Sequence, residues 1–286
     1  MATFTNQATL SYDGNVVNSN IVTGELQEVL SANKTALTDT YRVGEPQTFA
    51  ISLINSGATA FNGVTATDDL GAYSFGTPAR TVVPLDYVTG TVRYFIDGVL
   101  QPTPTVTAEN PLTVTGITVP ANGNALILYE AIPNQFAPLG PGGTVTNTVD
   151  VSGTGFTAFA AEGTVTADPG VDLSITKALD PVVVSENAPL TYTFTIQDRG
   201  STPAEATDNL VVSDTFNPRL TGITVTLNGA ALTEGTDYTY DEATGTFATT
   251  AGRITVPGAV FSQDTETGAY ITTPGASTLV VTGTVI

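Results

Sequence analysis

The feature that most constrains the fold is an internal repeat whose closing segment occurs in an unexpected place. Val29–Gly57 resembles Val171–Gly200, so the chain contains two related halves. The first half continues into a closing segment, TVTNTVDVSG at Thr144–Gly153, and the second half ends without one. A similar segment, TFTNQATLSYDG at Thr3–Gly14, stands at the start of the chain instead. This order predicts a subunit with an additional strand at its N-terminal end and a C-terminal domain that lacks its last strand.

Alternating residues predict β-strands throughout the chain. Runs such as TVTNTVDV, TYTFTI and LVVSDTF repeat with period two, which is the period of a half-buried strand. Turn signals such as NSG, DG and NG separate the runs at the spacing of a β-sandwich. The hydrophobic content of 41% fits a globular chain. We predict an all-β protein made of two tandem β-sandwiches.

The repeat divides this chain into three parts. Residues 1–28 are predicted to be an N-terminal donor strand and a linker, with Asn15–Gln27 as a spacer. Residues 29–165 are predicted to form a first sandwich that is complete in itself. Residues 166–286 are predicted to form a second, acceptor sandwich that lacks its last strand. The predicted hinge is ADPG at Ala167–Gly170.

The composition excludes several kinds of function. The chain has no Cys and no His, which removes thiolate chemistry, the commonest general base and the commonest metal ligand. Its net charge of −19 opposes nucleic-acid binding, and no run is apolar enough to insert in a membrane. The acidic segments Asp237–Gly245 and Ser262–Gly268 lack the spacing of a calcium loop. We therefore predict no enzyme activity towards a substrate, no cofactor and no metal.

No signal peptide is visible, so the chain is either a mature form or reaches the surface by another route.

Several pieces of the repeat resemble a known bacterial family as a set. They are DLSITKALDP, VVSDTF, TVTNTVDVSG and the strand starts NAPLTY and GEPQTF. The set is similar to the surface repeat called domain of unknown function eleven. That resemblance implies tandem immunoglobulin-like sandwiches and an extracellular location on a cell or spore surface. The chain departs from the family at its TxTN strand, because arrays of the family end each unit with that strand.

Strand alternation predicts polar side chains inside both sandwiches. Residues two apart in a strand share a face, so the apolar residues identify the face that points to the core. By this rule three polar residues point inward in the first half and two in the second: Lys34, Asp68, Asn147, Lys177 and Asp214. Burying an ion costs several kcal/mol unless it is paired, and an unpaired buried amide costs roughly 1–3 kcal/mol.

The inward Lys, Asp and Asn resemble the intramolecular isopeptide sites of Gram-positive pilins and adhesins. Burial favours a neutral Lys34 amine and a neutral Asp68 acid. The amine would attack the carboxamide of Asn147 with assistance from Asp68, and ammonia would leave. The alternative is a buried Lys34–Asp68 salt bridge with Asn147 hydrogen-bonded nearby.

The second half has the same lysine and aspartate, but no asparagine at the position that corresponds to Asn147. Lys177 and Asp214 match Lys34 and Asp68, and Glu45 and Glu186 are second candidates for the acid. The predicted amide for Lys177 is Asn6 of another copy, which gives a cross-link between subunits.

These features predict a filament subunit. The donor strand presents an inward face made of Phe4, Asn6, Ala8 and Leu10, and it would enter the second sandwich of a neighbour. The result is a head-to-tail homopolymer, like a pilus, outside the cell or on a spore. The alternative is a monomeric surface adhesin, cut from a longer repeat array, that binds a glycan or a protein. The strand could also fold back onto its own second sandwich, because Gly14–Val29 spans roughly 50 Å when extended.

Overall fold

The chain is all-β, as predicted. The computed structural model describes residues 2–26 and 28–286, and one short 3-10 helix, η1 (Ala206–Asp208), interrupts the strands of these ranges. Backbone contacts divide the chain into two compact units. Unit 1 covers residues 1–75, 79–134 and 145–165, and unit 2 covers residues 76–78, 135–144 and 166–286.

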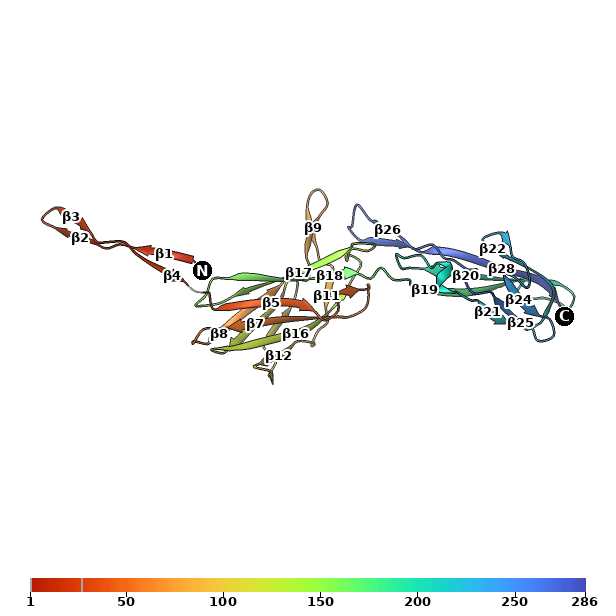
Figure 1. Ribbon diagram of the computed structural model, residues 1–286, viewed down its shortest axis with the longest axis horizontal. Helices are drawn as coiled ribbons and strands as arrows, with labels where there is room; N and C mark the ends of the chain where they lie inside the picture. Colours follow the sequence, from red (N-terminus) through yellow and green to blue (C-terminus); the bar gives the residue numbers. More distant parts are fainter. Residues whose placement is uncertain (1, 27) are drawn as a thin grey trace. The chain divides into compact units, whose positions relative to one another are not determined.

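The N-terminal segment forms a long two-stranded hairpin, here called the arm (Figure 1). β1 (Ala2–Asn6) pairs with β4 (Val22–Leu26), and β2 (Thr9–Tyr12) pairs with β3 (Asn15–Asn18). Among the described residues these four strands pair only with each other. The connecting residues Asp13 and Gly14 have φ values of 44° and 80°, the conformation that suits a tight turn between two strands.

The arm corrects the prediction of a single strand followed by a spacer. The described part of the spacer, residues 15–26, contains the two return strands. An Asp-Gly pair between alternating segments is a strong hairpin signal. A lone strand would leave its backbone groups without protein partners, whereas the hairpin pairs them. Gln27 of the predicted spacer lies outside the described residues.

Unit 1 contains two large sheets. Sheet I has the strand order β13-β12-β16-β7-β5, with β11 also paired to β16, and sheet II has the order β14-β15-β8-β17-β18-β6. The strands of sheet I are β5 (Leu30–Ala36), β7 (Gln47–Asn55), β11 (Leu85–Tyr87), β12 (Arg93–Ile96), β13 (Val99–Gln101) and β16 (Gly123–Pro133). The strands of sheet II are β6 (Thr40–Tyr41), β8 (Phe61–Asp68), β14 (Thr105–Ala108), β15 (Leu112–Val119), β17 (Thr144–Ser152) and β18 (Phe159–Ala167). A small hairpin joins β9 (Tyr73–Phe75) to β10 (Arg80–Val82). The burial alternates along β7, β16 and β17, so their apolar residues form the core.

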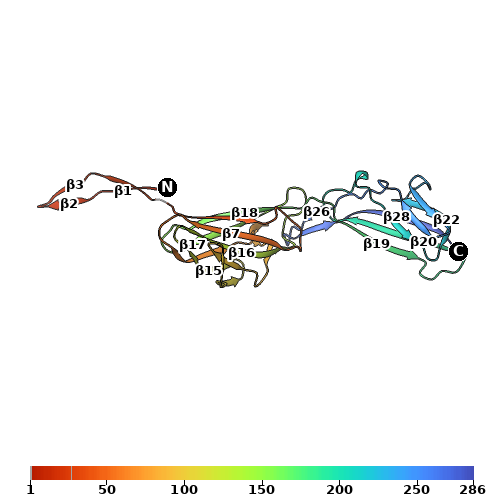
Figure 2. The ribbon, with the colours of Figure 1, turned by 60° about the horizontal axis from the view of Figure 1, so that its bottom comes forward.

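Unit 2 contains one large and one small sheet. Sheet III has the order β19-β20-β28-β22-β23, and its first four strands lie side by side in Figure 2. Its strands are β19 (Leu173–Asp180), β20 (Pro189–Asp198), β22 (Leu220–Leu227), β23 (Ala230–Ala231) and β28 (Gly275–Val285). Sheet IV has the order β21-β25-β24, with β21 (Ser213–Thr215), β24 (Tyr238–Asp241) and β25 (Thr246–Thr249). A further hairpin pairs β26 (Val260–Gln263) with β27 (Tyr270–Thr273).

The two units share a strand register. In unit 1 Lys34 of β5 lies opposite Ile51 of β7, and in unit 2 Lys177 of β19 lies opposite Phe194 of β20. The repeat seen in the sequence is therefore a structural repeat at the positions of both lysines.

The units differ at one sheet edge. In sheet II, Asp68 of β8 lies between two strands, opposite Leu112 of β15 and Val149 of β17. In sheet IV, Asp214 of β21 lies opposite Phe247 of β25, and the other edge of β21 has no strand partner among the described residues. The unpartnered edge of β21 is the position that β17 occupies in unit 1.

Candidate functional site

Four side chains from four strands form one polar cluster inside unit 1. Nζ of Lys34 donates a hydrogen bond to Oδ2 of Asp68 at 2.6 Å. The hydroxyl of Tyr129, on β16, donates to the same carboxylate oxygen at 2.6 Å. That hydroxyl also accepts a hydrogen bond of 2.7 Å from Nδ2 of Asn147, on β17. The structure thus brings together the three residues that alternation placed on inward faces, and adds a tyrosine.

The cluster is closed to solvent. Its four residues are at most 2% exposed, and the rings of Phe49 and Tyr129 lie 5.8 and 6.0 Å from Nζ of Lys34. Burial lowers the pKa of Lys34, against the opposing effect of the Asp68 charge. Burial raises the pKa of Asp68, against the opposing effect of Lys34. Both shifts favour transfer of a proton from the amine to the carboxylate, which leaves a neutral, nucleophilic amine.

One atom of the cluster lacks a hydrogen-bond partner. Oδ1 of Asn147 is buried and unsatisfied, although the amide nitrogen of the same side chain is bonded to Tyr129. A buried acceptor without a donor costs roughly 1–3 kcal/mol. The Tyr129 hydroxyl cannot supply that donor, because its proton is directed to Asp68. A proton on Asp68 would provide the cluster with an additional donor.

Unit 2 contains a related but open pair. Nζ of Lys177 donates to Oδ2 of Asp214, and it lies 4.3 Å from the ring centroid of Tyr192. The side chains of Lys177 and Asp214 are 40% and 19% exposed, whereas those of Lys34 and Asp68 are 0% and 2% exposed. The prediction of a buried lysine is therefore wrong for the isolated unit 2. The cause is the exposure of β19 along its whole length.

The tyrosine of the cluster has no counterpart in unit 2. Tyr129 lies opposite Phe49 in sheet I, and the matching pair in sheet III is Val281 opposite Tyr192. Both aspartates also accept a backbone hydrogen bond, Asp214 from Thr215 at 2.8 Å and Asp68 from Leu70 at 3.0 Å. The two lysine sites thus have the same acid, and the site in unit 1 has the tyrosine hydroxyl as an additional donor.

The acid beside each lysine is an aspartate. Glu45 and Glu186, the second candidates from the sequence, are exposed. Asp68 and Asp214 are the carboxylates that contact Lys34 and Lys177.

An apolar groove opens beside Lys177. It has a volume of about 330 Å³, and its lining residues are Ile175, Thr176, Lys177, Phe194, Val211, Val212, Ser213 and Asp214. Leu173, Ile175 and Val211 are 40%, 54% and 51% exposed. The groove runs between β19 and the free edge of β21, so it lies where unit 1 carries its closing strands.

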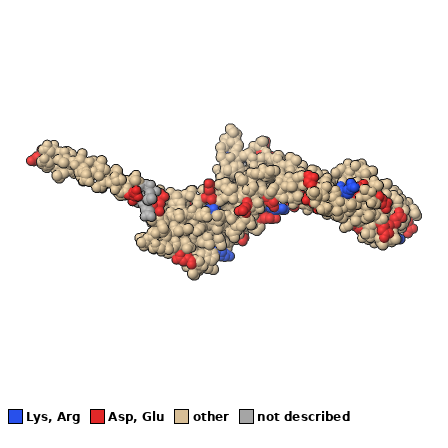
Figure 3. Space-filling model, in the orientation of Figure 1, with Lys and Arg blue, Asp and Glu red and all other residues tan. Residues whose placement is uncertain are grey.

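The predicted donor residues lie on the exposed arm. Asn6 lies opposite Val22 and is exposed, as are Phe4, Ala8 and Leu10. Between Ala2 and Leu26 only Asp13 and Glu25 are charged. In Figure 3 the visible face of the arm is accordingly uncharged except near its two ends.

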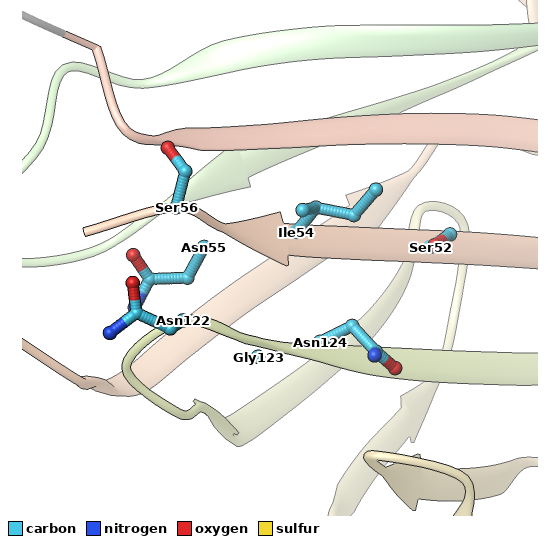
Figure 4. A pocket seen from close by; sticks show the side chains of 7 residues that line it. All are labelled: Ser52, Ile54, Asn55, Ser56, Asn122, Gly123 and Asn124. Carbon is cyan, nitrogen blue, oxygen red and sulfur yellow. The ribbon is translucent and has the colours of Figure 1, made fainter. Parts of the chain in front are cut away.

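A hollow at the end of β7 in unit 1 is a different kind of site. Figure 4 shows it at the end of β7, with a volume of about 490 Å³ and a lining of Ser52, Ile54, Asn55, Ser56, Asn122, Gly123 and Asn124. No lining residue is charged, and the Asn55 amide donates to the backbone oxygens of Thr59 and Pro120. Those bonds hold the adjacent loops in place. Within the described residues no three His, Cys, Asp or Glu side chains are grouped to hold a metal ion.

Sequence reasoning missed Tyr129. Its signal was present, because a tyrosine at an inward position of an apolar strand needs a partner for its hydroxyl. The run ALILYEAI placed Tyr129 on the inward face, and the polar residues predicted there were its available partners.

Comparison with known proteins gives distant similarities. No family model matches the chain, and no curated protein does. Among solved structures, the major pilin subunit of Bacillus cereus has 11% identity and a TM-score of 0.39, over 96% of this chain and 73% of that one. The pilus backbone of Streptococcus pneumoniae has 14% identity and a TM-score of 0.32, over 86% and 55%. A C-terminal fragment of the major pilin of Streptococcus agalactiae has 10% identity and a TM-score of 0.35, over 87% and 91%. At these values the function has to be argued from the geometry of the chain itself. No helix within the described ranges is long and apolar enough to cross a membrane.

Proposed function

We propose that the protein is the structural subunit of an extracellular filament on a cell or spore surface. The N-terminal arm of one copy enters unit 2 of the next copy, and the contact repeats head to tail. The observation that carries this proposal is the free edge of β21 beside an exposed apolar groove. Such an edge presents unpaired backbone groups, which favour the addition of a strand.

Unit 1 supplies the pattern for the contact. There β17 pairs with β8 and brings Asn147 into the cluster with Asp68. The arm carries the similar sequence TFTN, with Asn6 at the position of Asn147. Added to β21, it would bring a carboxamide towards Lys177 and Asp214. Because the donor and acceptor surfaces differ, the contact propagates as an open fibre unless it closes into a ring.

The same chemistry would lock both units. A proton moves from Lys34 to Asp68, the neutral Nζ attacks Cγ of Asn147, and the Cγ–Nδ2 bond breaks. One of the two protons left on Nζ passes to the leaving nitrogen, which departs as ammonia, and a new amide joins β5 to β17. In the joint between copies Lys177 attacks Asn6 in the same way, with Asp214 as the acid.

Electron microscopy of the purified protein tests the assembly. We expect fibres from the whole chain and none from a variant without residues 2–26. Fibres from the deleted variant would show that the arm is not the donor. A protein that stays monomeric under all conditions would support the alternative of a surface adhesin.

Denaturing electrophoresis tests the covalent joint. Fibres boiled in detergent should give a ladder of multimers, and Lys177→Ala should give fibres that separate into monomers. Arg199→Ala is the matched control, because it removes an exposed positive charge of unit 2 outside the groove. A ladder that persists in Lys177→Ala would exclude the proposed amide.

A further inference from the structure

Among the described residues, unit 2 contains no counterpart of the two strands that close sheet II of unit 1. In sheet II the order after β8 is β17 and then β18, and these two strands follow one another in the chain. Sheet IV ends at β21, with no described strand in either position. A single donated strand would therefore supply a counterpart of β17 but none of β18.

The second strand is the one that covers the lysine strand in unit 1. Gly163 of β18 lies so close to β5 that a Cβ atom there would be 3.0 Å from the backbone oxygen of Lys34. Lys34 is fully buried under this cover, and Lys177, which lacks it, has a side chain that is 40% exposed. Closing the groove over Lys177 therefore requires a counterpart of β18 as well as one of β17.

The arm has the register of that closing hairpin. The hydroxyls of Thr146 and Thr164 meet at 3.1 Å across β17 and β18, and these residues are 18 positions apart. Thr5 and Thr23 lie opposite each other in the arm and are also 18 positions apart. Asn147 and Asn6 each directly follow the first threonine of the pair. The half of the arm formed by β1 and β4 therefore reproduces the cross-strand spacing of the closing hairpin, whereas β2 and β3 are paired one residue out of this register.

The connections of the two hairpins differ in length, but each contains a glycine at the same position. Gly155 and Gly14 stand at the same distance from Thr146 and Thr5, and both have a positive φ, of 92° and 80°. A positive φ is a conformation that glycine adopts without steric cost.

One face of the arm is apolar and uncovered. Phe4, Leu10 and Val22 are 57%, 64% and 55% exposed. In the shared register Phe4 and Leu10 correspond to Val145 and Val151, which are 2% and 0% exposed in unit 1. Exposed apolar groups at positions that are buried in the repeat call for a partner surface.

The two hairpins differ next to the lysine strand. The counterpart of Gly163 is Val22, which has a larger side chain. An inserted arm must therefore lie farther from β19 than β18 lies from β5.

From these observations we infer that the donated element is the intact arm of a second copy of this chain, which adds two strands to the free edge of β21. In this arrangement β1 and β2 take the place of β17, and β3 and β4 take the place of β18. This inference rests on the proposed donation and specifies its form. A single-strand donor would first have to leave its own hairpin, whereas the intact arm keeps its pairing.

A disulfide across the arm separates the two forms of donation. The chain has no cysteine, so Thr5→Cys with Thr23→Cys introduces one cross-strand pair, on the face that is exposed in the closing hairpin. Thr9→Cys with Asn18→Cys introduces a second disulfide in the other half of the arm, where Oγ1 of Thr9 lies 3.2 Å from Oδ1 of Asn18. Each of these two disulfides is here called a lock. We expect the oxidised locks to form fibres at the rate of the reduced proteins. Locks that form fibres only after reduction would overturn the inference.

A second variant also distinguishes donation of the intact arm from donation of a single strand, because the two forms predict opposite outcomes for its fibre formation. Replacing residues 15–26 by glycine and serine at unchanged length removes the second strand and keeps the reach of the chain. We expect this variant to lose fibre formation, whereas a single-strand donor would assemble without the cost of opening the hairpin. Fibres from this variant would overturn the inference even if the locked arms also assemble. Fibres from the variant without residues 2–26 would instead refute arm donation as a whole.

Discussion

At the scale of single residues, the chain has only two lysines, and each is held between an aspartate and aromatic rings. In unit 1 the pair is buried and joined by Tyr129 to an amide, Asn147. An uncompensated ion there would cost several kcal/mol, so the cluster is stable only as a matched set. Formation of the amide removes both charges of the pair from the interior when Asp68 keeps the transferred proton.

The mass of unit 1 variants tests the role of Asp68. In the Lys177→Ala background, which removes the joint between copies, we expect the chain to be lighter than its sequence by one ammonia molecule. Asp68→Asn should have the full mass, because no group then accepts the proton of Lys34. Asp150→Asn, an exposed position of β17, is the matched control and should show the ammonia loss. An Asp68→Asn protein that still loses ammonia would exclude Asp68 as the assisting acid.

Heat stability should follow the same variants. The proposed Lys34–Asn147 amide would close a loop of roughly 100 residues, and a cross-link of that size is worth about 4–5 kcal/mol by the chain-entropy relation. Calorimetry should show a lower melting temperature for Asp68→Asn than for Asp150→Asn. Equal melting temperatures would argue against a cross-link in unit 1.

The Tyr129 hydroxyl should affect the rate of cross-linking more than its final extent. Tyr129→Phe keeps Lys34, Asp68 and Asn147 but leaves Nδ2 of Asn147 without its acceptor. A lost hydrogen bond of about 1 kcal/mol corresponds to a rate roughly five- to tenfold lower. Mass spectra of freshly refolded protein, taken over time, measure this rate. Tyr87→Phe, at the neighbouring ring of the same aromatic group, is the control.

Strand alternation predicted which residues point to the core of each unit, but it did not predict how far their side chains are exposed to solvent. The face of Lys34, Asp68 and Asn147 follows from period two within each strand. Lys177 follows the same rule, yet it is partly exposed, because cover depends on strands from elsewhere in the fold. Local periodicity carries no information about such cover.

At the scale of elements, the arm is the clearest departure from the sequence prediction. The sequence predicts that TFTNQATLSYDG is a closing strand and that the segment after its Asp-Gly turn is a spacer. The turn signal was present, but β17 and β18 are separated by a longer connection without an Asp-Gly pair. The two hairpins therefore have different turn sequences, and their similarity lies in the spacing of their paired threonines.

A substitution in the arm turn should slow assembly. Gly14 has a φ of 80°, and a valine there would be strained by about 1–2 kcal/mol. Gly14→Val should therefore weaken the hairpin and slow fibre growth, measured by light scattering. Gly98→Val is the matched control, since Asp97-Gly98 is also an Asp-Gly turn, with a φ of 79° at its glycine, and it connects β12 and β13 of unit 1. Faster growth of Gly14→Val would indicate that the hairpin has to open.

At the scale of the whole molecule, the proposed assembly has to overcome the charge of the subunits. Each carries a net charge of −19, so two approaching copies repel each other. The Debye length falls from about 30 Å at 0.01 M salt to about 8 Å at 0.15 M salt, which screens that repulsion. We expect fibre growth to accelerate with sodium chloride over this range. The variant without residues 2–26 should give no scattering at any of these concentrations, and growth that slows with salt would contradict the expectation.

The positions of the two lysines determine which parts of a filament would bear tension. If both amides form, a pulling force enters a subunit at Lys177 and leaves it at Asn6. Between these points the Lys34–Asn147 amide bypasses the whole peptide from residue 34 to residue 147, and the peptide after residue 177 lies outside the loaded path. Only the stretches 6–34 and 147–177 would be under load, so most of both units could unfold or exchange strands without lengthening the filament.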